Sequence, residues 1–188
     1  MQNKPTSVKI LLIRHGQAYH NIDNDYSLKD PTLTKLGIQQ AKNIKFKLNP
    51  DIVYFSPLTR TIETTKYIFK NKDIKDIKKF IPHEDLQETY AGERPCDTGI
   101  CTKSLQKNFP TFDFSNLRKK WFEPTVIQEK RVKNFLTFLS KELDKKTDVK
   151  CVVVVTHAGT IYRLTGKKVE NCEIVECKFM VKTAKLIC

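Results

Sequence analysis

Two short apolar runs constrain the fold of this chain more than any other feature. Residues 8–13 and 151–155 are built almost entirely from apolar side chains, many of them branched, and residues 52–55 form a third, shorter run. Such runs are typical of central strands that are buried on both faces of a sheet. We therefore expect at least three strands at the centre of the molecule.

Segments with helical spacing alternate with these runs. We predict a helix over residues 34–48 with Thr34 as its N-cap, and a second helix that begins at Ser56-Pro57, a preferred helix start. A third helix is predicted over residues 126–143, where apolar side chains recur three and four positions apart. This alternation indicates an α/β fold with a mostly parallel central sheet and helices on both faces.

The length of the chain fits one domain. Its 188 residues suffice to bury a core, so we expect a single domain over residues 1–188. Ile81 and residues 172–180 are candidates for edge strands. Residues 89–124 contain glycine, proline and several aromatic residues but no regular period. We interpret them as an irregular insertion, or lid, over the C-terminal edge of the sheet, which we expect to determine the substrate.

The composition argues against several classes of protein. Hydrophobic residues make up 39% of the chain, and its longest apolar stretch is far below the roughly 20 residues that span a bilayer. The N-terminus has no signal-peptide pattern, so we expect a cytoplasmic protein with no membrane association. The six cysteines form no CxxC pair, which argues against zinc and predicts free thiols. The net charge of +13 comes from scattered lysines typical of a solvated surface, and we expect no nucleic-acid partner.

Polar residues follow the two strongest strand candidates at the point where each one ends. Arg14, His15 and Gly16 come at the end of the first run, and His157 and Gly159 follow the last run. Ligands of open α/β sheets bind beyond the carboxyl ends of the strands, so we expect the two histidines to converge on one cleft. The glycines are expected to let the backbone approach a ligand closely.

Two arginines give this cleft the character of an anion site. Arg60 lies near the start of the second predicted helix, where the N-terminal N–H groups already favour an anion. Arg14 and Arg60 both present planar groups of donors that suit phosphate oxygens. The sequence therefore predicts a phosphate site beside two histidines.

Five motifs, taken in order, resemble the histidine phosphatase superfamily in its phosphoglycerate mutase-like branch. They are Arg14-His15-Gly16 with Asn21, the segment LTKLGIQQA at residues 33–41, Ser56-Pro57-Leu58-x-Arg60, Leu86-x-Glu88, and Thr156-His157-Ala158-Gly159. The resemblance covers residues 8–164. An Arg-His-Gly tripeptide recurs by chance, whereas five ordered motifs are specific.

The resemblance implies a phosphomonoester hydrolase that acts through a phosphohistidine and needs no metal or other cofactor. It makes His15 the nucleophile. Arg14, Arg60 and a protonated His157 would surround the phosphoryl oxygens. Asn21 would add a hydrogen bond to the phosphate or the substrate.

The resemblance also implies a general acid and base, for which Glu88 is the candidate. It would protonate the leaving alcohol and then activate water. Repulsion from the phosphate is expected to raise the pKa of this carboxyl group. Glu84, Asp85 and Glu93 stay open as alternatives, because branches of the family place the acid in different loops.

Four further residues are assigned to substrate binding, to the surface or to the structure. Gln17 and Arg94 are candidates for substrate binding. Many members of the family carry glutamate at the position of Gln17. Arg94 lies in a segment similar to one found in plant and fungal members. His20 could touch the substrate, although we favour a surface position, and His83 is expected to be structural. Cys96 is not expected to be a nucleophile, since no base is obviously paired with it.

Three other functions stay open. A phosphoglycerate mutase-type phosphotransferase would return the phosphoryl group to a bound hydroxy acid, but the chain between Glu88 and His157 lacks the tandem arginines typical of glycolytic mutases. The second is a catalytically inactive regulatory or binding protein on the same fold, and the third is a nucleic-acid-binding protein. The sequence leaves open whether the substrate is a small molecule or a phosphoprotein, and what the oligomeric state is.

Overall fold

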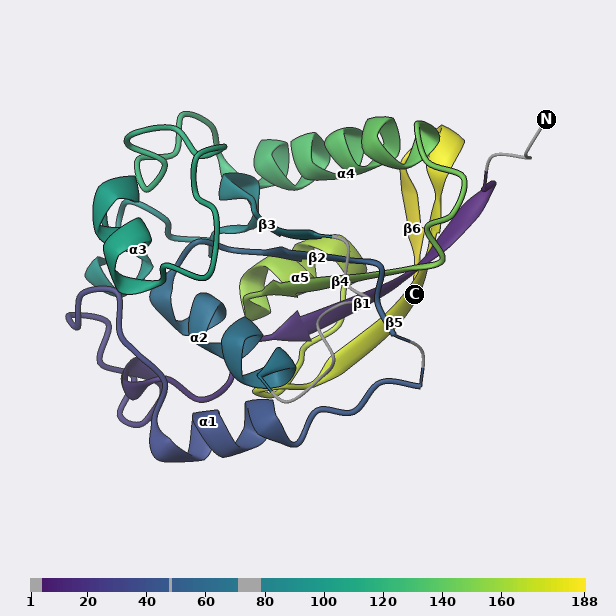
Figure 1. Ribbon diagram of the computed structural model, residues 1–188. Helices are drawn as coiled ribbons and strands as arrows, with labels where there is room; N and C mark the ends of the chain where they lie inside the picture. The colour runs from purple at the N-terminus through teal and green to yellow at the C-terminus, as the bar shows by residue number, and fades with distance from the viewer. Residues whose placement is uncertain (1–4, 48, 71–78) are drawn as a thin grey trace.

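A six-stranded sheet crosses the molecule in the order β3-β2-β4-β1-β5-β6 (Figure 1). The computed structural model describes residues 5–47, 49–70 and 79–188. The strands are β1 (Ser7–Arg14), β2 (Ile52–Phe55), β3 (Lys79–Pro82), β4 (Cys151–Thr156), β5 (Ile174–Met180) and β6 (Lys185–Ile187). Strands β3, β2, β4 and β1 pair in parallel, whereas β5 pairs antiparallel with β1 and β6. The mostly parallel α/β sheet is thus confirmed.

Helices cover both faces of this sheet, as predicted. They are α1 (Lys35–Lys42), α2 (Thr59–Phe69), α3 (Thr102–Asn108), α4 (Gln128–Asp144) and α5 (Ala158–Thr165). Helices α4 and α5 lie on one face, and α1 and α2 lie on the other (Figure 1). Alternate side chains of one strand enter different cores: Val152 and Val154 pack on the α4 side, and Val153 and Val155 on the α2 side. The central strands are therefore buried on both faces, which explains their continuous apolar runs.

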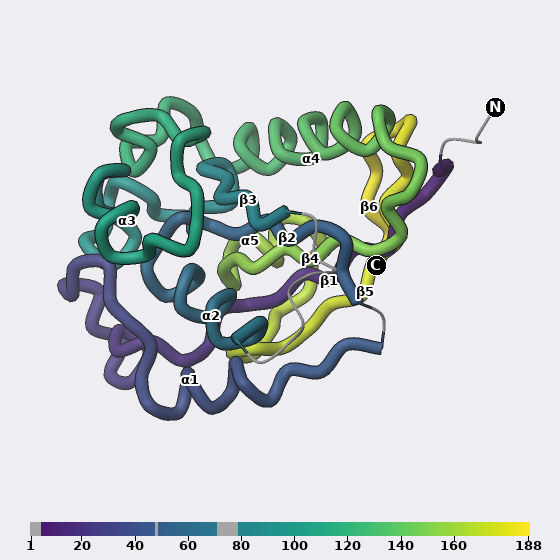
Figure 2. Tube along the Cα trace, in the orientation of Figure 1, coloured from purple at the N-terminus to yellow at the C-terminus, as the bar shows by residue number. Residues whose placement is uncertain are grey.

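The parallel strands end at a common edge of the sheet. The loop that follows β1 and the segment over residues 89–124 gather at this edge, on the left of Figure 2. Two separate stretches of chain thus border the place where the polar residues after β1, β2 and β4 emerge.

The starts of the helices differ in part from the prediction. Thr34 caps α1 as predicted, since its Oγ1 accepts a hydrogen bond from Gly37 N at 3.0 Å. Helix α1 ends at Lys42 instead of 48, a position outside the described residues. Helix α2 begins at Thr59 and not at Ser56-Pro57. The carboxylate of Asp30 accepts from Thr59 N at 2.9 Å and from Thr59 Oγ1 at 2.8 Å, so a distant side chain supplies the cap.

The C-terminal part of the chain also corrects two predictions. Strand β5 is not an edge strand, because β6 covers it, whereas β3 with Ile81 is at an edge as predicted. Cys177 and Cys188 form a disulfide, so the prediction of six free thiols is wrong for this pair; the other four cysteines are free. The antiparallel pairing of Lys178 with Ile187 brings the two thiols together, and this pairing is not visible in the sequence.

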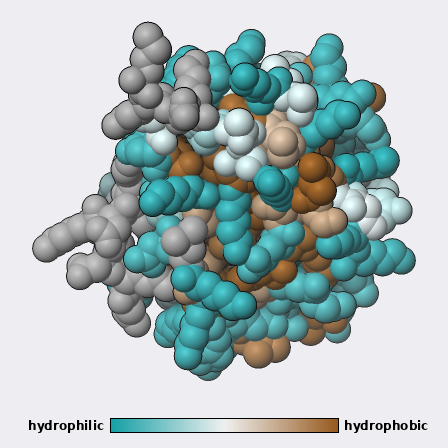
Figure 3. Space-filling model, turned by 90° about the vertical axis from the view of Figure 1, so that its right-hand side faces the viewer, coloured by the Kyte–Doolittle hydropathy of each residue, from teal (hydrophilic) through white to brown (hydrophobic). Residues whose placement is uncertain are grey.

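The surface agrees with the interpretation of the lysines as solvated. The face in Figure 3 carries mainly hydrophilic side chains with smaller apolar areas between them. Lys42, Lys45, Lys66 and Lys70 are all exposed. Across the described residues, no helix has both the length and the apolar character needed to cross a membrane.

The segment over residues 89–124 is packed more firmly than its irregular sequence suggests. Trp121 is fully buried, and its Nε1 donates to Ile100 O at 2.9 Å. Gly99 lies so close to the Trp121 ring that a Cβ atom there would overlap it. Phe112 and Phe114 pack against Phe55 of β2. The aromatic residues without a period are thus part of the core on the α2 side.

Candidate active site

The register of the sheet places the two predicted histidines beside each other. Arg14, the last residue of β1, pairs with Thr156, the last residue of β4. His15 and His157 therefore follow neighbouring strand ends, and their ring centroids lie 5.2 Å apart. Both side chains are buried, at 2% and 0% exposure. The two rings thus lie side by side as expected, although only His15 is among the residues that line the cavity at this edge of the sheet.

The tautomer of His15 follows from its two hydrogen bonds. Nδ1 lies 2.7 Å from the carbonyl oxygen of Gly16, which can only accept, so Nδ1 carries the proton. Nε2 accepts from Arg60 Nε at 3.3 Å. Burial, and next to it the charge of Arg60, lowers the pKa of His15 well below its usual 6.5. The ring is thus a neutral imidazole with its lone pair on Nε2, the form that a nucleophile needs.

Arg60 is the most thoroughly anchored cation of the site. It lies in the first turn of α2 and is only 1% exposed. Its Nη1 donates to Cys96 O at 2.6 Å, and its Nη2 forms a buried ion pair with Asp97 Oδ1 at 2.7 Å. Sequence reasoning missed Asp97, because no pattern links it to an arginine 37 residues away.

Arg14 is held by the turn that precedes β5. Its Nη1 donates to Val169 O at 2.8 Å, whereas its buried Nε has no hydrogen-bond partner among the described residues. The Asn171 side chain donates to His15 O at 2.9 Å, and Cys172 N donates to Arg14 O at 3.1 Å. This turn therefore fixes the backbone that carries both Arg14 and His15.

His157 is neutral in this structure. Its Nε2 shares a hydrogen bond with Ser56 Oγ at 2.9 Å, which ties the end of β4 to the end of β2. Burial, followed by the charge of Arg60, lowers the pKa of His157 well below 6.5. The expectation of a protonated His157 concerns the site with a phosphoryl group bound and stays a prediction.

The Glu88 carboxylate accepts three hydrogen bonds. They come from Thr89 N at 2.7 Å, Thr89 Oγ1 at 3.1 Å and Gly159 N at 3.2 Å, and they fix Glu88 against the start of α5. It lines the same cavity as His15. The three alternative carboxylates line other cavities: Glu84 and Asp85 face one, and Glu93 another. The geometry thus favours Glu88 over its neighbours.

The glycines of the motifs serve packing between protein segments. A Cβ atom on Gly16 would lie 2.6 Å from the carbonyl oxygen of Gly37 in α1. A Cβ atom on Gly159 would overlap the side chains of Thr89 and Glu88. In both cases a protein segment approaches the glycine closely, and the predicted approach of a ligand stays a prediction.

The loop after β1 brings two of its three candidate residues to the cavity. Asn21 lines the cavity, and its bond to the phosphate or the substrate stays a prediction. Gln17 is not among the residues that line it, and its Oε1 accepts from Thr34 Oγ1 at 2.8 Å, so it connects this loop to α1. His20 is 6% exposed and lines the cavity, which contradicts the surface position that we favoured.

The cavity itself has a volume of about 280 Å³ and is lined mainly by polar residues. They are Arg14, His15, His20, Asn21, Asn24, Tyr26, Arg60, Glu88, Thr89, Tyr90, Arg94, Cys96, Asp97, Ala158 and Gly159. In the described part of the chain, no group of three or more histidine, cysteine, aspartate or glutamate side chains is arranged to hold a metal ion.

Arg94 is clamped between two tyrosine rings beside this cavity. Its guanidinium carbon lies 3.6 Å from the Tyr90 ring centroid and 4.6 Å from that of Tyr26. No carboxylate of the described residues forms an ion pair with it. Its N–H groups are thus free of an anion from the described residues, and the expected contact to a substrate stays a prediction.

Two other residues behave as the sequence predicts. Burial raises the pKa of the Cys96 thiol to about 11, which makes it a poor nucleophile. His83 packs against Phe135 and Phe138, with ring centroids 5.2 and 4.5 Å away. Its structural role is confirmed.

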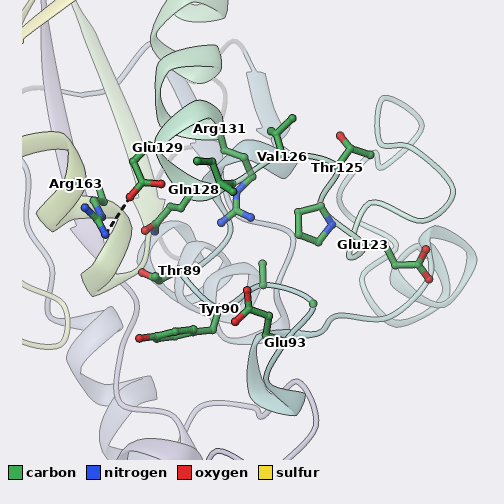
Figure 4. Close-up of a pocket in the computed structure, with 14 residues that line it drawn as sticks. Thr89, Tyr90, Glu93, Glu123, Thr125, Val126, Gln128, Glu129, Arg131 and Arg163 are labelled. Atoms are coloured by element: carbon green, nitrogen blue, oxygen red, sulfur yellow. Dashed lines mark ion pairs between the residues drawn. The ribbon is translucent and has the colours of Figure 1, made fainter.

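A second, larger cavity of about 640 Å³ adjoins the first (Figure 4). Thr89 and Tyr90 line both cavities. Arg131 points into the larger one from α4, and Arg163 pairs with Glu129 at 3.0 Å at its side. Space for a larger ligand is therefore present beyond Thr89 and Tyr90, next to the cavity that His15 lines.

Comparison with known proteins identifies the family. The family described as the histidine phosphatase superfamily (branch 1) matches residues 10–176. A probable phosphatase of Schizosaccharomyces pombe is 29% identical over 183 residues, which cover 89% of this chain and 81% of the relative. The 5''-phosphoribostamycin phosphatase of Niallia circulans is 30% identical, with 82% and 75% covered.

Solved structures agree at the level of the fold. The ecdysone phosphate phosphatase from Bombix mori has a TM-score of 0.67 at 15% identity, and the match covers 96% of this chain and 92% of that chain. Enzymes of this family transfer the phosphoryl group through a phosphohistidine. The chain therefore belongs to branch 1 of the histidine phosphatase superfamily and is a phosphatase that acts on a phosphorylated substrate.

Proposed function

We propose that His15 is the nucleophile with which this protein hydrolyses phosphomonoesters, and that Arg14, Arg60, His157 and Asn21 hold the transferring phosphoryl group. The observation that carries the proposal is the neutral His15 ring, whose Nε2 lone pair faces Arg60 in a cavity with a carboxylate. Arg60 Nε donates to this nitrogen, and a phosphoryl oxygen would accept that hydrogen bond instead, which frees the lone pair for attack.

In the first step, His15 Nε2 attacks phosphorus and the ester P–O bond breaks. Glu88, in its protonated form, gives its proton to the leaving oxygen. In the second step, Glu88 takes a proton from water, the water oxygen attacks phosphorus, and the P–N bond breaks. The dianion of the bound phosphoryl group raises the pKa of a neighbouring imidazole, so His157 becomes protonated when substrate binds.

Arg94 and the segment over residues 89–124 are proposed to select the leaving group. Thr89, Tyr90 and Arg94 belong to this segment and line the cavity. We further propose that the segment acts as a lid on a single domain. The kind of substrate, a phosphorylated small molecule or a phosphoprotein, and the location in the cytoplasm stay predictions. A panel with both kinds of phosphoester tests the first, and cell fractionation tests the second.

The first experiment is such a panel on the wild type and on His15→Ala, with EDTA present throughout. We expect turnover of some alkyl phosphates by the wild type, none by the variant, and a base-stable, acid-labile label on His15. A label that survives in His15→Ala would move the nucleophile elsewhere. Loss of turnover in EDTA would contradict metal independence, and no turnover of any ester would favour a binding protein.

Two further measurements separate hydrolysis from transfer and test the acid. Given 3-phosphoglycerate and a bisphosphoglycerate primer, a mutase would form 2-phosphoglycerate and release no inorganic phosphate. Glu88→Gln should reduce hydrolysis of an alkyl phosphate about 100-fold or more, and that of an aryl phosphate far less, because an aryl leaving group needs little protonation. Equal losses on both substrates would remove Glu88 from this role.

A further inference from the structure

His20 is a third histidine of the site, and the steps above do not use it. It is 6% exposed and lines the cavity together with His15 and Arg60. Its ring centroid lies 5.8 Å from that of His15. A polar side chain so close to the reacting atom and so deeply buried requires an account of its hydrogen bonds.

Those hydrogen bonds determine which ring nitrogen carries the proton. The backbone N–H of Ala18 can only donate, and it lies 3.0 Å from Asn21 Oδ1, so the amide oxygen faces Ala18. The amide nitrogen of Asn21 then faces His20 Nε2, at 3.0 Å, and donates to it. His20 Nε2 is therefore an acceptor, and its proton is on Nδ1.

The protonated nitrogen has no acceptor within the protein. His20 Nδ1 is buried and lacks a hydrogen-bond partner among the described residues. Buried donors without a partner are uncommon in folded proteins, and a catalytic role is one of their recognised explanations. Burial, followed by the charges of Arg60 and Arg14, lowers the pKa of His20 to about 3, so the ring stays neutral near pH 7.

We propose that His20 is a further catalytic residue, whose Nδ1–H donates a hydrogen bond to a non-bridging oxygen of the transferring phosphoryl group. Asn21 is the positioning residue that keeps the proton on Nδ1. The inference rests on the proposed function, since it requires a phosphoryl group at His15. A fixed neutral donor stabilises charge that develops in the transition state. It does so without a further positive charge that would also hold the phosphate product.

Two substitutions of similar polarity test where the donor must lie. In His20→Asn, the amide nitrogen can occupy the position of Nδ1, whereas in His20→Gln it falls nearer to that of Nε2. We expect His20→Gln to lose about 100-fold or more in kcat, the cost of removing one such donor, and His20→Asn to lose clearly less because it keeps a donor near the position of Nδ1. Equal losses in the two variants, or a better-preserved Gln variant, would overturn the proposal and indicate a packing role.

A measurement on the wild-type protein keeps the test independent of folding. Nitrogen-15 NMR of the histidine rings, with orthovanadate as the phosphoryl analogue, should show His20 protonated on Nδ1 and a shift of this signal when vanadate binds. An Nε2-protonated ring, or an Nδ1 signal that stays unchanged while His15 responds to vanadate, would overturn the inference. If no phosphoester is hydrolysed although vanadate shifts the His20 signal, the proposed function fails while the oxyanion contact of His20 stands.

Discussion

The buried ion pair between Arg60 and Asp97 makes the sharpest prediction about stability. The two side chains are 1% and 5% exposed, and Nη2 lies 2.7 Å from Oδ1. Removal of one partner of a buried pair costs about 3–5 kcal/mol, because it leaves a charge without compensation in a poorly solvated place. In Asp97→Ala, Arg60 keeps its hydrogen bonds to Cys96 and His15. We therefore expect a loss at the lower end, about 3 kcal/mol in the free energy of unfolding.

Activity should fall together with stability in this variant. Without Asp97, the guanidinium loses one of three contacts, and we expect kcat/KM to drop by about tenfold or more as phosphoryl oxygens meet a less ordered donor group. Asp97→Asn keeps the shape and an accepting oxygen but loses the charge, so it should lie between the wild type and Asp97→Ala on both measures. Urea unfolding and steady-state kinetics on an aryl phosphate give the two numbers.

An exposed pair provides the matched control. Lys120 and Glu123 lie 3.2 Å apart with 67% and 57% of their side chains exposed. Glu123→Gln should change the free energy of unfolding by less than about 0.5 kcal/mol, since exposed pairs contribute little. If Asp97→Ala costs no more than this control, the reasoning from burial is refuted.

Four further predictions concern other parts of the chain. Gly159→Ala should displace the Glu88 carboxylate and reduce kcat for alkyl phosphates about tenfold or more while sparing aryl phosphates, and equal losses would show a general disturbance. Arg94→Gln should raise KM about tenfold for substrates with an acidic leaving group, with kcat nearly unchanged; a kcat effect alone would contradict a binding role. Burial lowers the pKa of His83 to about 4, so from pH 6.5 down to 4 the unfolded chain takes up a proton that the folded chain does not. The free energy of unfolding should therefore decrease by up to about 3 kcal/mol as the pH is lowered from 6.5 to 4. His83→Phe should make the free energy of unfolding from urea titrations depend less on pH in this window. Cys177→Ser should lower the free energy of unfolding by about 2–3 kcal/mol, and dithiothreitol should have the same effect on the wild type but not on the variant.

The sheet and the pair of histidines were predictable because they depend on local patterns and one general rule. Continuous apolar runs indicated strands buried on both faces, and parallel strands end at the same edge of a sheet. Those two facts suffice to bring His15 and His157 together. Arg60 was predictable for a similar reason, since it belongs to the first turn of a helix that follows a strand.

The features that the sequence did not reveal arise from contacts between distant segments. The partner of Arg60 is Asp97, the cap of α2 is Asp30, and the partner of Cys177 is Cys188. Each of these side chains has an ordinary local context, so no period or motif singles it out. His20 was misjudged because a lone polar residue in a loop resembles a surface residue, and only tertiary packing makes it 6% exposed.

The pairing of Arg14 with Thr156 has a consequence for how substrate preference can be changed. The backbone ladder between β1 and β4 sets the spacing of His15 and His157, although 142 residues separate them in the chain. Loop exchange within residues 89–124 leaves this ladder intact. Under the proposed function, grafts that keep Cys96 and Asp97, which hold Arg60, and the aromatic residues of the core would change the leaving-group side of the site without moving the two histidines.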